Sequence, residues 1–303
     1  MRLPGTTAVT DLDVAIVGVP FDIGTSNRPG ARFGPRAIRS ESVLIRPYNM
    51  ATRAAPFDSL RIDDTGDVAT NPYNLADSVE RITAHYGSLL EQSPLDRGPG
   101  TVTLGGDHTI VLPILRALHA VHGPVGLVHV DAHTDINDTM FGEKVAHGTP
   151  FRRAVEEGLL DPKRTVQIGI RGALYSNHDK DWGLQQGIRV IEIEECHDLG
   201  IDGVIAEARR VVGTGPTYLS FDVDALDPVY APGTGTPEIG GLTTYEAQRM
   251  IRGMRGLNLV GADVVEVSPP FDMSGNTALV AVTVMFEILC LLAENIGRDK
   301  AAG

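Results

Sequence analysis

The stretch Val125–Asp135, VGLVHVDAHTD, joins an apolar run to a row of polar residues. An apolar run, typical of a strand buried on both faces, leads into Asp131, His133 and Asp135 at every second position. Residues two apart on a strand share a face, so these polar side chains begin on one side as the chain leaves the sheet. The stretch predicts a buried strand whose carboxyl end carries ligands for a metal ion or a proton.

Short β-branched runs of this kind alternate with helical patterns along the whole chain. This alternation is typical of an α/β fold in which helices cover both faces of a parallel sheet. The predicted strands are DVAIVGV (13–19), LRIDDTGD (60–67), TVTLGG (101–106), VGLVHVD (125–131), TVQIGIR (165–171), IRVIEIE (188–194), TYLSFDVD (217–224) and LVGADVVEV (259–267). The predicted helices are 79–92, 109–123, 150–160, 204–212 and 244–254, and the buried face of the second comprises Ile110, Val111, Ile114, Leu115, Leu118 and Val121.

The size of the chain fits one large domain covering residues 1–303. A chain of 303 residues with 42% hydrophobic content can bury an extensive core. We find no internal repeat, no low-complexity tract and no linker rich in Pro, Gly or Ser that would divide it.

Charge and cysteine content narrow the classes of function. The net charge of −13 argues against a nucleic-acid surface, because phosphate binding needs Lys and Arg. An acidic protein attracts a small cationic substrate, although the same excess of acid also serves solubility alone. The two cysteines, Cys196 and Cys290, form no disulfide framework, so we expect a reducing cytoplasm.

No targeting or membrane segment is expected. The first twenty residues lack the basic start, apolar core and cleavage site of a secretory signal. The apolar run 278–296 is interrupted by Glu287 and falls short of the roughly 20 uncharged residues that a membrane span needs. We interpret it as a buried helix and expect no membrane partner.

Two long irregular stretches, Pro20–Arg39 and Asp227–Thr243, each follow a predicted strand. Long loops within a compact domain usually bind something or form a lid. Ligands of open parallel sheets bind beyond the carboxyl ends of the strands. Both loops are therefore predicted to wall the same crevice.

Two further strands end in candidate ligands. SFDVD places Asp222 and Asp224 on one side, and TVTLGG runs into Asp107 and His108. Because the carboxyl ends of parallel strands share an edge of the sheet, these clusters are expected to meet Asp131, His133 and Asp135.

Two neighbouring polar residues have a simpler explanation. Asp107 is interpreted as a cap that holds nearby backbone, and His129, which lies earlier in its strand, as a packed and hydrogen-bonded histidine. For the other six residues a purely structural role is too costly, because crowded carboxylates repel one another and lose hydration unless cations neutralise them.

The composition of the cluster indicates the metal. Four aspartates balance two divalent ions, and two imidazoles add neutral donors. Carboxylate and imidazole ligands without thiolate favour Mn²⁺ over a structural zinc site, although affinity order alone favours Zn²⁺ or Ni²⁺. We predict two Mn²⁺ per subunit.

Five blocks of the sequence resemble the signature blocks of the ureohydrolase family, the arginases and agmatinases. They occur in the family's order and, with RPGARFGPRAIR and HGTPFRRAVEEGLLDP, cover nearly the whole chain. Within the family, ESVLIRPYNMATRAAPFDSL and FGEKVAHGTPF are most similar to bacterial guanidinobutyrases, and guanidinopropionases are also similar. The blocks are GGDH (105–108), DAHTD (131–135), SFDVDALDP (220–228), APGTGTPEIGG (231–241) and EVSPPFD (266–272).

The resemblance implies a fold and two ligand sets. The implied fold is a single three-layer α/β/α domain with an eight-stranded parallel sheet, commonly assembled into trimers or hexamers. One manganese is expected to bind His108, Asp131, Asp135 and Asp222. The other is expected to bind Asp131, His133, Asp222 and Asp224, so that Asp131 and Asp222 bridge the pair.

The resemblance also implies a reaction. Two divalent ions can share one water and lower its pKa until hydroxide exists near neutral pH, and the bridging hydroxide then attacks the guanidino carbon to give urea and an amine. Glu266, at a strand end, is expected to bind the guanidinium, although it can also be a simple cap. His147 precedes a helix as a cap would, and its family counterpart shuttles protons, with Asp135 helping to move the proton.

The substrate tail is not determined by these motifs. Asn137 and Thr236 are candidates for the pocket wall, although turn chemistry explains them equally well. A carboxylate tail needs donors such as Arg28 or Arg32, Arg46 and Tyr48, whereas the amine of agmatine needs an acid. We expect 4-guanidinobutanoate as substrate. Guanidinopropionase, agmatinase, hydrolysis of another guanidino or formimino acid, and a noncatalytic metal-binding assembly subunit are the alternatives, the last disfavoured by the intact Glu266 and His147.

Overall fold

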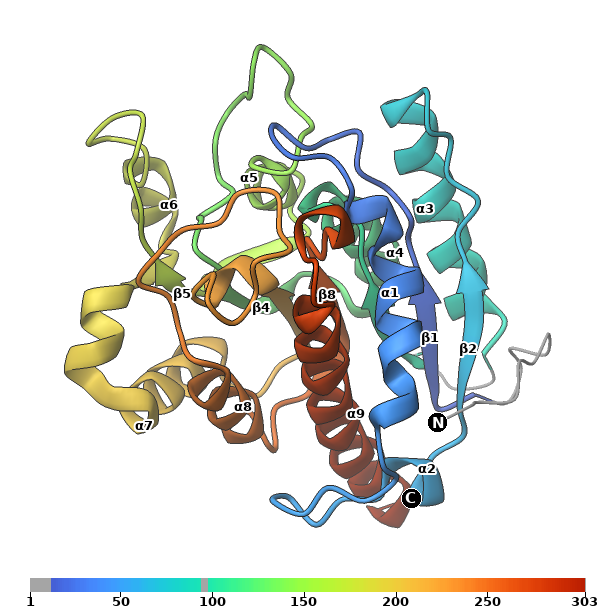
Figure 1. The fold of residues 1–303 in the computed structure, drawn as a ribbon. Coiled ribbons are helices and arrows are strands. Elements are labelled where there is room, and N and C mark those ends of the chain that lie inside the picture. The colour runs from blue at the N-terminus through green and yellow to red at the C-terminus, as the bar shows by residue number, and fades with distance from the viewer. Residues whose placement is uncertain (1–11, 94–97, 303) are drawn as a thin grey trace.

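An eight-stranded, all-parallel sheet runs through the centre of the protein, with helices on both faces (Figure 1). The computed structural model describes residues 12–93 and 98–302. The spatial order of the strands is β2-β1-β3-β8-β7-β4-β5-β6. Their bounds are β1 Val14–Gly18, β2 Ile62–Asp67, β3 Gly100–Leu104, β4 Val125–Val130, β5 Leu160–Ile170, β6 Arg189–Glu192, β7 Thr217–Asp222 and β8 Leu259–Val265.

Two apolar cores, one on each face of the sheet, define the three layers. One core joins the sheet to α1 (Gly34–Glu41), α7 (Ile193–Val212), α8 (Thr244–Gly253) and α9 (Asn276–Ala302). The other joins it to α3 (Leu75–Glu91), α4 (Val111–His122) and α5 (Pro150–Glu156). Two short helices, α2 (Pro56–Ser59) and α6 (Asp181–Gln186), complete the set among the described residues. The predicted three-layer α/β/α architecture is confirmed.

All eight predicted strands are present. The stretch Val125–Asp135 forms β4 and the start of the loop that follows it. Every residue of β4 is buried, because helices cover both faces of the sheet at this strand. β5 begins at Leu160, five residues before the predicted start at Thr165. The first half of β5, LDPKR, is mostly polar and therefore lacks the sequence pattern of a buried strand. In this half only Leu160 pairs with β4.

The structure corrects three predictions about helices. The stretch Pro20–Arg39 is not irregular throughout, because α1 begins at Gly34 and Pro35 occupies its first turn, where the fixed φ of proline favours a helix. The predicted helix 150–160 ends at Glu156, and Gly158, with φ +73°, turns the chain into β5. Val121 is 39% exposed because the last turn of α4 extends into solvent.

The apolar C-terminal helix belongs to the core. Residues 276–297 of α9 are long and apolar enough to cross a membrane by length and composition, yet 78% of the apolar window is buried inside the fold. Glu287, in its middle, is 3% exposed and pairs with Arg252 and Asn49. The interpretation as a buried helix is confirmed, whereas residues 1–11, which bear on the absence of a secretory signal, lie outside the described residues.

Candidate metal centre

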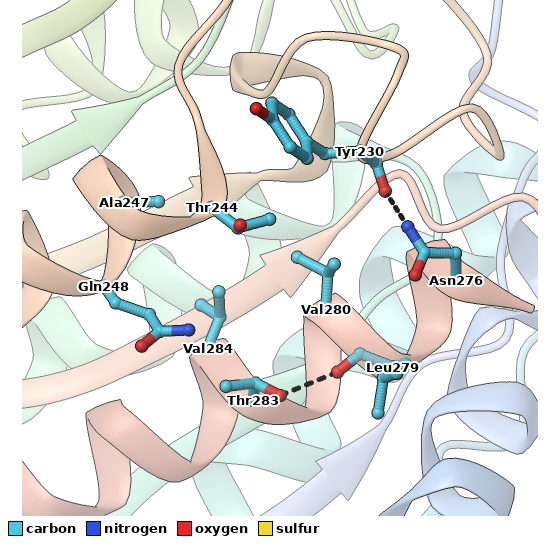
Figure 2. Close-up of a pocket in the computed structure, with 9 residues that line it drawn as sticks. All are labelled: Tyr230, Thr244, Ala247, Gln248, Asn276, Leu279, Val280, Thr283 and Val284. Atoms are coloured by element: carbon cyan, nitrogen blue, oxygen red, sulfur yellow. Dashed lines mark hydrogen bonds between the residues drawn. The ribbon is translucent and has the colours of Figure 1, made fainter.

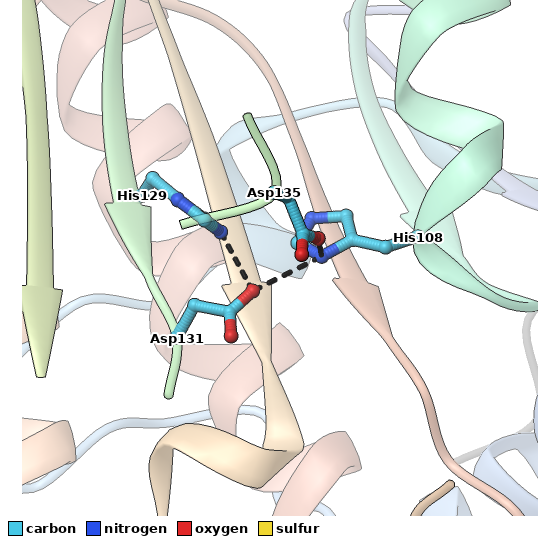
Figure 3. Close-up of side chains that lie close together, drawn as sticks. All are labelled: His108, His129, Asp131 and Asp135. Carbon is cyan, nitrogen blue, oxygen red and sulfur yellow. Dashed lines mark hydrogen bonds and ion pairs between the residues drawn. The ribbon is translucent and has the colours of Figure 1, made fainter. Parts of the chain in front are cut away.

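Three segments far apart in the sequence meet where β3, β4 and β7 end. His108, just after β3, lies in the middle of the cluster and is completely buried. Its Nδ1 lies 3.1 Å from Asp131 Oδ2, 3.0 Å from Asp135 Oδ2 and 3.3 Å from Asp222 Oδ2. Figure 3 shows His108, Asp131 and Asp135 converging. The predicted ligands of the first metal are therefore close neighbours.

A second group of ligand atoms shares Asp131 with the first. His133 Nδ1 lies 3.5 Å from Asp131 Oδ1 and 3.1 Å from Asp224 Oδ2. Asp131 thus presents Oδ2 to His108 and Oδ1 to His133, an arrangement that allows this carboxylate to be shared by two metal ions. The His133 side chain is 33% exposed, so solvent reaches the second group more readily than the first.

The electrostatics of the cluster favour bound positive charge. Burial, together with the charges of Asp224 and Asp131, raises the pKa of Asp222 well above its ordinary value. Burial lowers the pKa of His133, but Asp224 and Asp131 outweigh it and raise this pKa to about 12. The buried carboxylates therefore demand positive charge, which divalent ions supply in place of protons.

The donors present fit a pair of metal ions. The buried Nδ1 of His108 forms no hydrogen bond of acceptable geometry with any described residue, although three carboxylates surround it. An imidazole nitrogen left free beside carboxylate oxygens is a metal-ligand arrangement. With Asp131 shared by both groups, the site is binuclear.

His129 also lies within the first group, but both of its ring nitrogens already have partners. Its Nε2 lies 2.7 Å from Asp131 Oδ2, and Gln167 Nε2 lies 3.1 Å from its Nδ1. The prediction of a packed, hydrogen-bonded histidine is confirmed, and His129 orients the carboxylate of Asp131 (Figure 3).

Asp107 has the capping role predicted for it. Its Oδ1 accepts from the Thr109 amide at 2.9 Å and its Oδ2 from the Gly24 amide at 2.8 Å. It therefore joins the loop after β1 to the start of the helix that carries His108. Burial and the charge of Glu266 raise the pKa of Asp107 to about 7.

Glu266 and His147 form a second buried pair beside the ligands. Glu266 Oε1 accepts from the His108 backbone amide at 2.9 Å and lies 3.2 Å from His147 Nδ1. Ser26, in the loop after β1, contacts His147 Nε2 through its backbone nitrogen at 3.1 Å and its hydroxyl at 2.8 Å. Burial lowers the pKa of His147, but the hydrogen bond and charge of Glu266 outweigh it and raise this pKa to about 9.

Two residues of the site are held in the left-handed backbone region. Asp135 has φ +52° and Glu266 has φ +63°. For a residue with a side chain such a conformation costs about 1–3 kcal/mol and persists only where the surrounding structure enforces it. The strain at both positions is consistent with a backbone shaped by function.

The two predicted loops meet over the site. Asn27 Nδ2 donates to Gly235 O at 3.2 Å, and Thr236 Oγ1 donates to Asp224 Oδ2 at 3.3 Å. Thr236 therefore touches a ligand. Asn137 donates its backbone amide to Gly148 O, and no contact within the described part of the chain ties its side chain to the cluster.

Several supporting residues were not predicted. Ser220 contacts His108 Nε2, and Arg171 binds the carbonyl oxygens of Asp224 and Glu238 and so fastens the loop after β7. A signal for Ser220 was present, since it has the strand parity of Asp222. No comparable signal marks Arg171, because Asp224 and Glu238 lie more than fifty residues away and contribute only backbone carbonyl oxygens.

A cavity of about 240 Å³ between α8 and α9 lies apart from these ligands (Figure 2). Hydroxyl, amide and aliphatic side chains line it, among them Tyr230, Thr244, Gln248 and Val280. None of its described lining residues is a carboxylate or an imidazole, so this cavity cannot hold the metal pair.

A comparison with known protein families identifies the family of the chain that carries this metal centre. Residues 12–291 match the model of the arginase family. The chain belongs to the arginase family. As an arginase-family protein with a binuclear metal site, it is a hydrolase of guanidino C–N bonds, a ureohydrolase.

Individual relatives of this ureohydrolase extend over nearly its full length. A guanidinobutyrase of Pseudomonas aeruginosa is 58% identical over 301 residues, covering 98% of this chain and 93% of the relative. A guanidinopropionase of the same organism is 56% identical, covering 99% and 92%. The solved structure of proclavaminate amidino hydrolase from Streptomyces clavuligerus superposes with a TM-score of 0.92 at 40% identity, covering 97% and 96%. The fold is therefore that of the arginase family.

Proposed function

We propose that this ureohydrolase hydrolyses a guanidino acid, with 4-guanidinobutanoate preferred, to urea and 4-aminobutanoate. The observation that carries the choice of an acid is Arg28. This residue is exposed in the loop that also supplies Ser26 to His147, and its guanidinium lies over the Phe271 ring, 5.4 Å from the centroid. No described carboxylate pairs with it, so it is available to a substrate anion.

Three other candidate donors, Arg32, Arg46 and Tyr48, are less suited to this role. Arg32 is paired with the buried Asp22. Arg46 donates to the carbonyl oxygens of Val43 and Leu44. Tyr48, which lies two residues beyond Arg46, is exposed on the same segment. Of these four residues, Arg28 is the nearest in sequence to Ser26, which contacts His147.

The loop after β7 passes beside Glu266 at Gly235. A Cβ added to Gly235 would lie 3.4 Å from Glu266 Oε2, so the backbone of this loop lies close to that oxygen. Glu266 Oε1 is held by the His108 amide and His147, which orients the carboxylate and leaves Oε2 to accept a charge-assisted hydrogen bond from the substrate. Glu266 is proposed to bind and orient the guanidinium.

His147 is proposed to deliver the proton that the departing amine needs. In its neutral form Nδ1–H donates to Glu266 and Nε2 accepts from the Ser26 amide, and in its charged form Nε2–H donates to the Ser26 hydroxyl. Both forms thus have partners, and the exposed Ser26 connects the imidazole to solvent. Asp135, beside His108, is proposed to accept the proton released at the metal edge of the site.

The metals are proposed to be two Mn²⁺, held by His108, Asp131, His133, Asp135, Asp222 and Asp224. When bound, they supply a water nucleophile at neutral pH and stabilise developing negative charge. Six oxygen and imidazole donors without sulfur favour Mn²⁺ over a structural zinc site.

The chain is proposed to act as one domain, residues 1–303, and to assemble as a homo-oligomer, a trimer or hexamer. A cytoplasmic location agrees with Cys196 and Cys290, which are both free and buried.

Urea release with added Mn²⁺ tests the proposal. The panel is 4-guanidinobutanoate, 3-guanidinopropanoate, agmatine, arginine and a formimino acid, compared by kcat/KM. We expect 4-guanidinobutanoate to lead. A wide advantage for agmatine would overturn the assignment of an acid substrate, and activity on none of the compounds would favour a noncatalytic metal-binding subunit.

A further inference from the structure

A chain of buried hydrogen bonds lies beneath the metal centre and ends at His108. Ser220 Oγ lies 2.8 Å from His108 Nε2 and donates to Asp263 Oδ1 at 2.7 Å. Tyr218 donates its hydroxyl to Asp263 Oδ2 at 2.8 Å. All of these side chains are fully buried, and Ser220 is the direct neighbour of Asp263 across β7 and β8.

The direction of these hydrogen bonds follows from counting protons. A carboxylate has no proton to donate, so Asp263 accepts from both hydroxyl groups. Ser220 has one hydrogen and gives it to Asp263. Towards His108 the serine oxygen can then only accept, so His108 Nε2 must carry a hydrogen. In a neutral imidazole this leaves Nδ1 bare.

The bare nitrogen is the one that faces the ligand cluster. His108 Nδ1 lies within 3.3 Å of Asp131, Asp135 and Asp222. The opposite tautomer would place a hydrogen on Nδ1, where a metal ligand needs a lone pair. It would also turn the Ser220 hydroxyl towards His108 and leave the buried Asp263 with one hydrogen bond fewer. An unsatisfied buried polar group costs about 1–3 kcal/mol, and a charged group costs more.

We propose that Asp263 and Ser220 are positioning residues that hold His108 in the tautomer required for metal binding. Asp263 acts through Ser220, and neither touches the metal or the substrate. This inference deepens the metal-centre part of the proposed function. It concerns metal binding alone, so failure of the substrate panel and failure of this inference are distinguishable.

The effect is expected at one metal and not at both. His108 belongs to the first group of ligands, whereas His133 and Asp224 hold the second without help from Ser220. Partners of this kind typically contribute 10–100-fold to metal affinity. Loss of the chain should therefore weaken one Mn²⁺ by about 10–100-fold and spare the other.

The experiment compares metal-free wild type with the variants Ser220→Ala and Asp263→Asn. Each protein is titrated with Mn²⁺, and binding is measured by calorimetry and by electron paramagnetic resonance. We expect one weakened site in each variant and, at limiting Mn²⁺, the six-line spectrum of single ions where wild type shows a coupled pair. Thr217→Val is the matched control. Thr217 is buried on the same strand, but its hydroxyl donates to Gly215 O, at the end of β7 away from the ligands.

Two results would overturn the inference. One is unchanged affinity in both variants, and the other is an equal loss in Thr217→Val, which would indicate a general effect of sheet stability. Neutron diffraction of the wild-type protein provides a test that no folding defect can disturb. With Mn²⁺ bound, deuterium on His108 Nε2 and between Ser220 and Asp263 supports the inference, whereas a His108 Nε2 without deuterium or deuterium on the Asp263 carboxyl refutes it.

Discussion

At the scale of single residues, the metal ligands were the most predictable part of the site. Residues two apart on a strand share a face, which groups Asp222 with Asp224 and Asp131 with His133. In a parallel sheet both pairs lie at the same edge, where the strands end. The side chains that orient the ligands were harder to foresee. Asp263 looks like an isolated acid within an apolar strand, and its partner Ser220 becomes evident only through the register of β7 and β8.

Changing His147 separates a chemical role from a structural one. His147→Ala removes the imidazole between Glu266 and Ser26, and a lost acid–base group typically costs about 10²–10⁴-fold in rate. We expect kcat to fall within that range while two Mn²⁺ remain bound, as measured by urea release and elemental analysis. Loss of a metal in this variant would show that His147 is needed to build the centre.

Changing Arg28 tests recognition of the substrate tail. Arg28→Gln removes the charge over Phe271, and a hydrogen bond to a charged group contributes about 1.5–3 kcal/mol in favourable cases. For this exposed position we expect the KM for 4-guanidinobutanoate to rise about tenfold, with kcat little changed and agmatine not disfavoured. The matched control is Arg53→Gln, since Arg53 is also exposed and also has positive φ, at +62°. An unchanged KM would exclude Arg28 from the tail site.

At the scale of elements, periodicity predicted the strands better than the helix ends. The continuous apolar run of β4 has few alternatives to a buried strand. Helix ends depend instead on local backbone geometry, as at Gly158. The Gly and Pro residues at and before the start of α1 resemble loop signals, although Gly34 and Pro35 in fact form the first turn of that helix. Such positions cannot be resolved from composition, because proline favours both turns and first helical turns.

The start of α9 gives a pH-dependent prediction. Asp272 accepts from the Thr277 amide at 2.5 Å and from the Ser274 amide at 3.0 Å. Burial raises the pKa of Asp272, but these hydrogen bonds outweigh it and lower this pKa from 3.8 to about 2. A depressed carboxyl pKa contributes stability above the unfolded value of 3.8, and that stability is lost as the pH falls through about 2.

Asp272→Asn should remove this contribution. We expect a loss of about 1 kcal/mol in the free energy of unfolding at pH 7, after allowance for solvent screening of a partly exposed group, and a smaller loss at pH 3. Urea unfolding of wild type and variant at both pH values measures it. Asp198→Asn, at an exposed position on α7, provides the control and should change little at either pH. Equal losses for Asp272→Asn at both pH values would show that the charge is not the source.

Across the protein, the metal centre lies where the ends of three strands and two long loops come together. His108, Asp131 and Asp222 follow three different strands, and the loops after β1 and β7 lie over them. The sequence predicted this meeting of strand ends but not the hydrogen bonds between the loops, because Asn27 and Gly235 are 208 residues apart and neither has a distinctive pattern.

Removal of metal should therefore destabilise the entire fold. A ligand at 100 times its Kd stabilises the folded state by about 2.7 kcal/mol per site, and 1 kcal/mol corresponds to about 2–4 °C in Tm for chains of 150–250 residues. Chelation is thus expected to lower Tm by about 5–10 °C for each site emptied, and Mn²⁺ should restore it. Calorimetry of chelated and reloaded protein measures the change. The carboxylates of the metal-free protein repel one another, and Asp222→Asn removes one of them. The variant should therefore have a Tm higher than that of chelated wild type. Because Asp222 is also a predicted metal ligand, added Mn²⁺ should raise the Tm of the variant only slightly. If chelation left the wild-type Tm unchanged, the buried carboxylates would have to be balanced by protons on His108 and His133, and the cluster would not be a metal centre.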